Sequence, residues 1–237
     1  MRHRPALAAL SALLAATAGC ADIEGLQSDG DLGEAHAPLT LWKGLRPSPP
    51  PPGDDPGVPA AVPGLPAVPS GSMRGVDPLA VVRADITAAA RRDGGTGRLV
   101  DPRALRRLAL CTQAVDSGGK AGAGCPVRPA VLHDLTGDGK EDLITALDLD
   151  GRLSELRVYS VRNGRITRVL SRRAVLEGVE VAAEHLAVRE PTSDRGLVAV
   201  SDYVWDPDAG TMELAQLSLD DCPERGQDSE PCPQGEI

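Results

Sequence analysis

Aromatic side chains are nearly absent from this chain, whose 237 residues include two Trp, two Tyr and no Phe. A hydrophobic core without aromatic rings has to be built from Val, Leu, Ile and Ala, so we expect a small core of modest stability. Lysine is scarce as well, with three residues beside many arginines. The length is enough for one or two ordinary domains.

Positive charge is also in deficit, because the formal net charge is −9. Binding to nucleic acid relies on clustered Lys and Arg that meet phosphates, and adhesion to anionic lipid relies on a basic patch. The charge therefore argues against both, and we expect no nucleic-acid partner. An acidic surface suits divalent cations or a basic partner better, although solubility alone is the simpler explanation.

Sequence motifs of enzymes are missing. The chain has no Gly-x-Ser-x-Gly turn for a nucleophilic serine and no His-Glu-x-x-His pair for a metalloprotease. Residues 137–140 resemble the end of a phosphate-binding loop, but Asp134 stands where its first Gly belongs, and the neighbouring aspartates would repel phosphate. His133 adjoins this run and could orient it, although a turn-stabilising His is more common. We predict that the chain is not an enzyme; an unrecognised hydrolase would need a site assembled purely by the fold.

The amino terminus has the layout of an export signal. Arg2 and Arg4 precede an apolar stretch at 6–18, which is too short to span a bilayer as a permanent helix. Residues 17–20, Thr-Ala-Gly-Cys, resemble the lipobox of bacterial lipoproteins, although that family usually has Leu where Thr17 stands. The resemblance implies that residues 1–19 are removed and that Cys20 receives a diacylglyceryl group, whose two acyl chains give stable anchoring. We expect a lipid anchor on the extracytoplasmic face of the cell membrane; the alternative is an ordinary secretory signal with an incidental Cys20.

Residues 20–75 are rich in Pro and Gly and show no hydrophobic periodicity, above all between 46 and 72. Proline fixes φ and lacks an amide proton, so this stretch favours extended polyproline II mixed with coil. We predict a disordered, lipid-anchored spacer, with order beginning near Val76. A proline-rich ligand for a partner's groove is the alternative, and residues 39–42 could form a short docking element.

Residues 76–218 have the patterns of a folded domain that opens with two short helices. Asp77-Pro78 is a helix-start signal, because Asp accepts from free amides and Pro fits the first helical turn. Apolar residues then recur at helical spacing up to the glycines at 94 and 95. The same Asp-Pro pair at 101–102 starts a second helix that runs towards Cys111.

After Val131 apolar residues recur at every second position, and this alternation predicts β-strands. Asn163-Gly164 is a strong hairpin signal, because both residues tolerate the positive φ of a type I′ turn. Short strands joined by short turns predict an antiparallel β-meander, so the fold class is α+β. The expected strands cover residues 143–147, 153–161, 166–170, 179–181, 186–189, 197–205 and 211–217, and residues 219–237 form an acidic tail with two cysteines.

Four cysteines besides Cys20 are an even number, as expected for disulfides in an exported chain. Four cysteines allow three pairings. The sequence-local pairing joins Cys111 to Cys125 and Cys222 to Cys232 and closes two short loops. Zinc binding is the alternative, but no Cys-x-x-Cys pair exists and no His lies beside these cysteines.

Residues 134–143 read Asp-Leu-Thr-Gly-Asp-Gly-Lys-Glu-Asp-Leu and place oxygen ligands at alternate positions. Calcium takes six to eight oxygens, and a tight loop with alternate ligands can wrap one ion. The run is not an EF-hand, because Thr145 stands at the twelfth position, where that motif has Glu. It resembles the calcium loop of FG-GAP and VCBS-type β-repeats, which implies calcium binding through the Asp134, Thr136, Asp138 and Asp142 side chains and the Lys140 carbonyl. With only three carboxylates among these ligands, we expect the binding to be weak.

The alternative for this run is that its aspartates close turns by bonding the backbone, with no ion. The repeats of that family occur many times and form a propeller, whereas this chain has one copy, so a propeller is excluded.

The whole layout resembles small actinobacterial envelope lipoproteins, some of which modulate envelope sensors. That resemblance implies a non-catalytic accessory or regulatory binding module that contacts an envelope protein. The alternatives are a structural lipoprotein associated with the cell wall and an unrecognised envelope hydrolase.

Overall fold

A computed structural model describes residues 39–41, 59–93, 102–111, 124–149, 153–194 and 196–221. All of them belong to one compact unit, His36–Ile237. The predictions for the signal at 1–19, for Cys20 and for the Cys222–Cys232 pair lie outside the described residues. None of the helices that the structure describes is long and apolar enough to cross a membrane.

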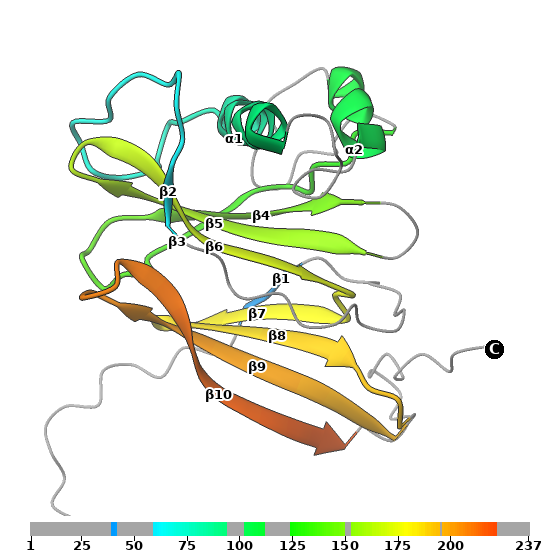
Figure 1. The fold of residues 1–237 in the computed structure, drawn as a ribbon. Helices are drawn as coiled ribbons and strands as arrows, with labels where there is room; N and C mark the ends of the chain where they lie inside the picture. The colour runs from blue at the N-terminus through cyan, green and yellow to red at the C-terminus, as the bar shows by residue number, and fades with distance from the viewer. Residues whose placement is uncertain are drawn as a thin grey trace, which may run out of the picture. The chain divides into compact units, whose positions relative to one another are not determined.

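The described strands form two five-stranded antiparallel sheets, stacked in layers with the helices over one of them (Figure 1). The sheet under the helices, called the helix-covered sheet below, has the order β2 (Ala60–Ala61), β6 (Arg165–Ala174), β5 (Ser154–Arg162), β4 (Asp142–Asp148) and β3 (Val131–His133). The second sheet has the order β1 (Leu39–Leu41), β7 (Gly178–Ala182), β8 (His185–Pro191), β9 (Leu197–Asp206) and β10 (Thr211–Asp221).

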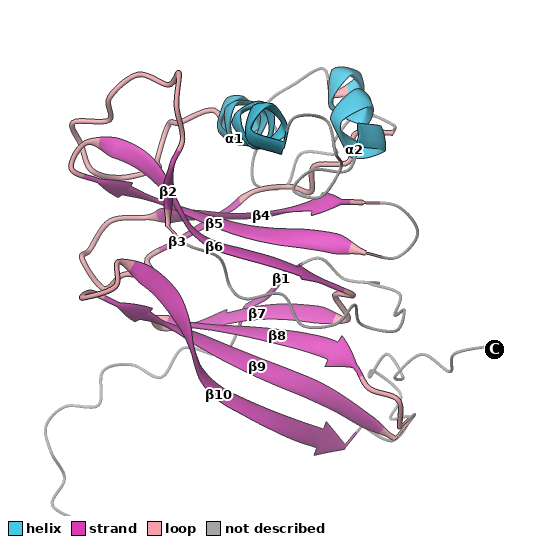
Figure 2. Ribbon diagram, in the orientation of Figure 1, coloured by secondary structure: helices cyan, strands magenta, loops and turns pink. Residues whose placement is uncertain are grey.

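The helices are α1 (Pro78–Asp93) and α2 (Pro102–Arg107), and α2 continues into the 3-10 helix η1 (Leu108–Leu110). Asp77 Oδ1 accepts the Leu79 amide at 2.9 Å, so the predicted helix start is confirmed. Figure 2 shows both helices on the outer face of the helix-covered sheet. The apolar side of α1 faces that sheet, with Leu79, Val82 and Ile86 at most 2% exposed.

Two hydrophobic clusters lie on opposite faces of the helix-covered sheet. On the helix side, Ile86 of α1 belongs to one cluster with Leu143 and Tyr159 from the strands. Between the sheets, Ile144 and Leu156 belong to the other cluster, together with residues of β7, β8 and β9. A central strand of a three-layer structure is covered on both faces, and residues 154–161 of β5 are accordingly all buried.

The sequence predicted the two helices and the antiparallel strands, and the structure confirms both. The strands do not form the single predicted meander, however, but two separate sheets. Strands β3 to β6 form consecutive hairpins in one sheet and β7 to β10 in the other, and residues 175–177 pass between the sheets. The last strand extends to Asp221, beyond the predicted domain end at 218.

Order begins earlier than predicted. The predicted docking element contributes β1, in which Leu39 pairs with Val181 and Leu41 is buried. Residues 59–75 contain β2 and pack on the helix-covered sheet, where Met73 is completely buried. The prediction of a disordered spacer up to residue 75 is therefore wrong for these residues, because isolated apolar side chains such as Val62 reach the core between the prolines.

Candidate functional site

The acidic run at 134–142 forms the loop between β3 and β4 and the entrance to β4. Asp134 accepts two backbone amides, from Gly137 to Oδ1 at 2.8 Å and from Gly139 to Oδ2 at 2.7 Å. Asp138 Oδ1 accepts the Lys140 amide at 2.9 Å. Gly137 and Gly139 have φ of +68° and +76°, which glycine adopts at little cost. The loop is thus closed by side-chain-to-backbone bonds.

Asp142 is the buried carboxylate of this loop. Its Oδ2 accepts the amides of Leu135 at 2.9 Å and Thr136 at 3.1 Å, and the side chain also bonds Ser160. Burial raises the pKa of Asp142 from 3.8 to about 6, and the nearby charge of Asp134 adds to the rise against these hydrogen bonds. With a pKa of about 6, Asp142 gains or loses its proton close to the physiological pH range, so the charge of the loop depends on pH there.

The loop also contacts the turn between β7 and β8, which belongs to the other sheet. His133 Nε2 lies 2.6 Å from the carbonyl oxygen of Ala183, a residue with a positive φ of 49°. Gly137 faces Glu184, because a Cβ on Gly137 would lie 2.6 Å from Glu184 Oε1. His133 therefore bonds a neighbouring turn, as the sequence suggested for it.

A third segment joins the same loop from before α1. The Met73 amide donates to the carbonyl of Glu141 at 2.8 Å, and Arg74 forms a salt bridge with the Glu141 side chain. The loop thus connects both sheets and the segment leading to α1. This position makes it a structural junction of the domain.

Most of the predicted calcium ligands already accept backbone hydrogen bonds within the described loop. No three His, Cys, Asp or Glu side chains among the described residues are placed so that they could hold a metal. Both Asp134 oxygens and Asp142 Oδ2 accept amides, while Thr136 Oγ1 is buried with no hydrogen-bond partner in the described part of the chain. The geometry matches the alternative of turns closed by aspartates, and calcium binding stays a prediction from sequence.

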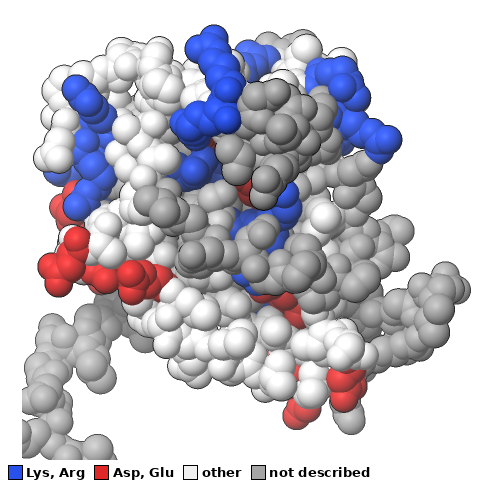
Figure 3. Space-filling model, in the orientation of Figure 1, with Lys and Arg blue, Asp and Glu red and all other residues white. Residues whose placement is uncertain are grey.

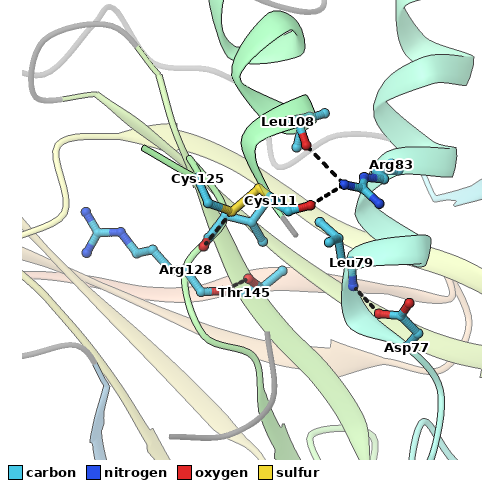
Figure 4. Close-up of a disulfide and its surroundings, with 9 residues drawn as sticks. Asp77, Leu79, Arg83, Leu108, Cys111, Cys125, Arg128 and Thr145 are labelled. Atoms are coloured by element: carbon cyan, nitrogen blue, oxygen red, sulfur yellow. Dashed lines mark hydrogen bonds between the residues drawn. A yellow bond between two sulfur atoms is a disulfide. The ribbon is translucent and has the colours of Figure 1, made fainter. Parts of the chain in front are cut away.

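The predicted bond between Cys111 and Cys125 is present, with a Cα–Cα distance of 4.7 Å (Figure 4). It joins the end of η1 to the segment before β3. Arg83 of α1 donates to the carbonyls of Leu108 at 3.2 Å and Cys111 at 2.5 Å. Figure 4 shows the disulfide between the helices and the strands, so it ties the helical layer to the helix-covered sheet.

A cluster of buried charges lies between α1 and the helix-covered sheet. Asp85 Oδ2 accepts Arg157 Nη1 at 2.6 Å and the Tyr159 hydroxyl at 3.0 Å. Arg168 Nη1 lies 3.0 Å from Asp85 Oδ1. Arg157 also bonds Glu155 at 2.5 Å. Asp85 and Arg157 are 1% exposed each, so every charge here is balanced within the protein.

Sequence reasoning missed this cluster, although two signals could have found it. Asp85 lies on the apolar side of the predicted helix, between Val82 and Ile86. In the predicted strand at 153–161, Glu155 and Arg157 share a face with the apolar residues that follow at alternate positions. A charge on an apolar face indicates a buried partner on another element.

Burial raises the pKa of the Tyr159 hydroxyl above its ordinary value, and the charge of Asp85 adds to the rise. Glu155 is also buried, but the charges of Arg157 and Arg173 outweigh burial and lower its pKa. Tyr159 thus stays protonated and donates to Asp85, and Glu155 stays ionised. This charge state suits a structural cluster that holds α1 on the sheet.

Comparison of the chain with family models, with curated proteins and with solved structures gives no match.

Proposed function

We propose that this protein is a non-catalytic, lipid-anchored binding module on the extracytoplasmic face of a cell membrane. The disulfide between Cys111 and Cys125 is the observation that carries the proposal. Stable disulfides belong to oxidising compartments outside the cytosol. The bond supports export independently of the signal at residues 1–19, whose end at Cys20 resembles a lipobox.

The two described histidines lie against acceptor oxygens. His133 bonds the Ala183 carbonyl, and His185 Nδ1 lies 2.8 Å from Asp202 Oδ2. General base catalysis needs a His within hydrogen-bond distance of the group that it deprotonates. In both cases the partner is an acceptor oxygen and not the side chain of a Ser or Cys nucleophile.

Lipid anchoring is tested by expressing the full chain in a bacterium that processes lipoproteins and by labelling it with a radioactive fatty acid. We expect label on the wild type and none on Cys20→Ser, which should also leave the membrane fraction. Ser28→Ala, in the predicted spacer, is the matched control and should be labelled normally. An unlabelled wild type with an intact amino terminus and reduced cysteines would contradict the proposal.

A further inference from the structure

The last strand leaves one edge of the second sheet open. β10 spans Thr211–Asp221 and pairs with β9, and no other described strand pairs with it. The remaining edges formed by described residues, β1, β2 and β3, have only two or three residues each. A long edge strand presents unpaired amides and carbonyls that can accept another strand.

One face of β10 carries an exposed row of leucines. Leu214, Leu217 and Leu219 are 46%, 63% and 63% exposed. A bulge between Leu214 and Gln216 shifts the register, so the three leucines lie opposite Tyr203, Ser201 and Ala199 of β9 and share one face of the sheet. Apolar side chains in a row on an open edge indicate a contact surface.

The charge of β10 is acidic. Residues 211–221 contain Glu213, Asp220 and Asp221 and no Lys or Arg, and one of the three, Asp220, forms an ion pair with Arg189 of β8 at 3.2 Å. In Figure 3, Lys and Arg gather over the helices and the helix-covered sheet, whereas the visible surface of the second sheet is mostly neutral with acidic groups at its margins. Charge complementarity therefore favours a basic partner strand.

A second copy of this chain fits the edge poorly. The acidic residues lie near both ends of β10, so an antiparallel pair of two β10 strands would bring Glu213 of one copy close to Asp220 or Asp221 of the other. Like charges opposite each other destabilise strand pairing.

We propose that β10 binds an extended segment of a partner protein by strand addition, and that this segment alternates apolar residues with Lys or Arg. Its apolar side chains would cover Leu214, Leu217 and Leu219, and its cations, on the opposite face of the sheet, would lie near Glu213 and Asp220. The proposal names the contact surface of the binding module, and in that respect it rests on the proposed function.

The test uses the full chain in detergent micelles and a labelled synthetic peptide of alternating Val and Lys, as long as β10. Fluorescence anisotropy at physiological salt should show saturable binding. The double variant Leu217→Ser and Leu219→Ser should bind at least tenfold more weakly, with unchanged thermal melting because both side chains are exposed. Leu110→Ser removes a similarly exposed leucine, 50% exposed, from the helical layer and should bind like the wild type.

Two further peptides separate strand addition from simple charge attraction. A peptide with the same composition but with its Lys residues clustered should bind at least tenfold more weakly, and so should one with Glu in place of Lys. Equal binding of the clustered peptide, no binding of the alternating one, or dimers of the full chain that the double variant abolishes would each overturn the proposal. None of these results bears on acylation of Cys20, so failure here is distinguishable from failure of the anchoring experiment.

Discussion

Asp85 of α1 and Arg157 of β5 lie 72 positions apart in the chain, and Asp85 Oδ2 lies 2.6 Å from Arg157 Nη1. Both side chains are 2% exposed. A buried ion pair loses much of its attraction to desolvation, so it adds little net stability compared with apolar residues. Breaking it is costly, however, because an uncompensated charge stays buried. We infer that the pair determines where α1 sits on the sheet.

Asp85→Asn should lower the free energy of unfolding by about 3–5 kcal/mol, because Arg157 and Arg168 lose their carboxylate partner. Urea denaturation of the two proteins measures the difference. Arg91→Ala removes an exposed charge from the same helix and should change stability by less than about 0.5 kcal/mol. If both variants had equally small effects, Glu155 alone would suffice to balance Arg157.

Removal of the disulfide should also destabilise the domain. The bond closes a loop between positions 14 apart, and the Cys111→Ser, Cys125→Ser double variant should lose about 3 kcal/mol. Reductant should lower the denaturation midpoint of the wild type towards that of the double variant and leave the variant itself unchanged. An unchanged wild-type midpoint would mean that the bond contributes little beyond what the Arg83 contacts already provide.

Local patterns predicted the elements of this fold well. The hairpin signal at Asn163-Gly164 lies in the turn between β5 and β6, where both residues have positive φ. The Asp77-Pro78 signal gives the start of α1. These features depend on neighbouring residues, which the sequence displays directly.

The division into two sheets depends on contacts between distant residues and could not be predicted in this way. The sequence of residues 175–177 does not differ from that of a short turn between paired strands, yet β6 and β7 lie in different sheets. β2 was missed because two residues, Ala60 and Ala61, are too few to show the alternation of apolar and polar residues that marks a strand. Their pairing with β6 also depends on residues about a hundred positions away. For the candidate calcium loop, the sequence gives the residue types but not the direction of each carboxylate.

Calcium binding by the loop is tested by thermal melting in millimolar calcium and in chelator. Because both Asp134 oxygens and Asp142 Oδ2 already accept amides, we expect the two melting temperatures to agree within error. Asp138→Ala should then melt alike in both conditions too. A higher melting temperature in calcium that Asp138→Ala abolishes would show that the loop rearranges around the ion, as the sequence resemblance implies.

Asp142 should make stability depend on pH in a direction opposite to that of an ordinary paired carboxylate. Its pKa is 3.8 unperturbed and about 6 in the folded chain, so between these values the folded state holds a proton that the unfolded state has lost. Stability from this group therefore falls as pH rises from about 4 to about 6 and is constant above that, with a total on the order of 3 kcal/mol.

Asp142→Asn keeps an oxygen that can accept the Leu135 and Thr136 amides but removes the titration. Relative to the wild type, the variant should gain stability between pH 4 and pH 7, which urea denaturation in chelator at a series of pH values measures. Glu155, whose pKa is lowered mainly by Arg157 against the effect of burial, titrates in the opposite direction, but it is common to both proteins and cancels in the difference. Asp208→Asn removes an exposed carboxylate from the β9–β10 turn and controls for net charge. A constant difference between wild type and Asp142→Asn across this range would show that Asp142 stays ionised in the fold, with its hydrogen bonds to Leu135, Thr136 and Ser160 outweighing the effect of burial.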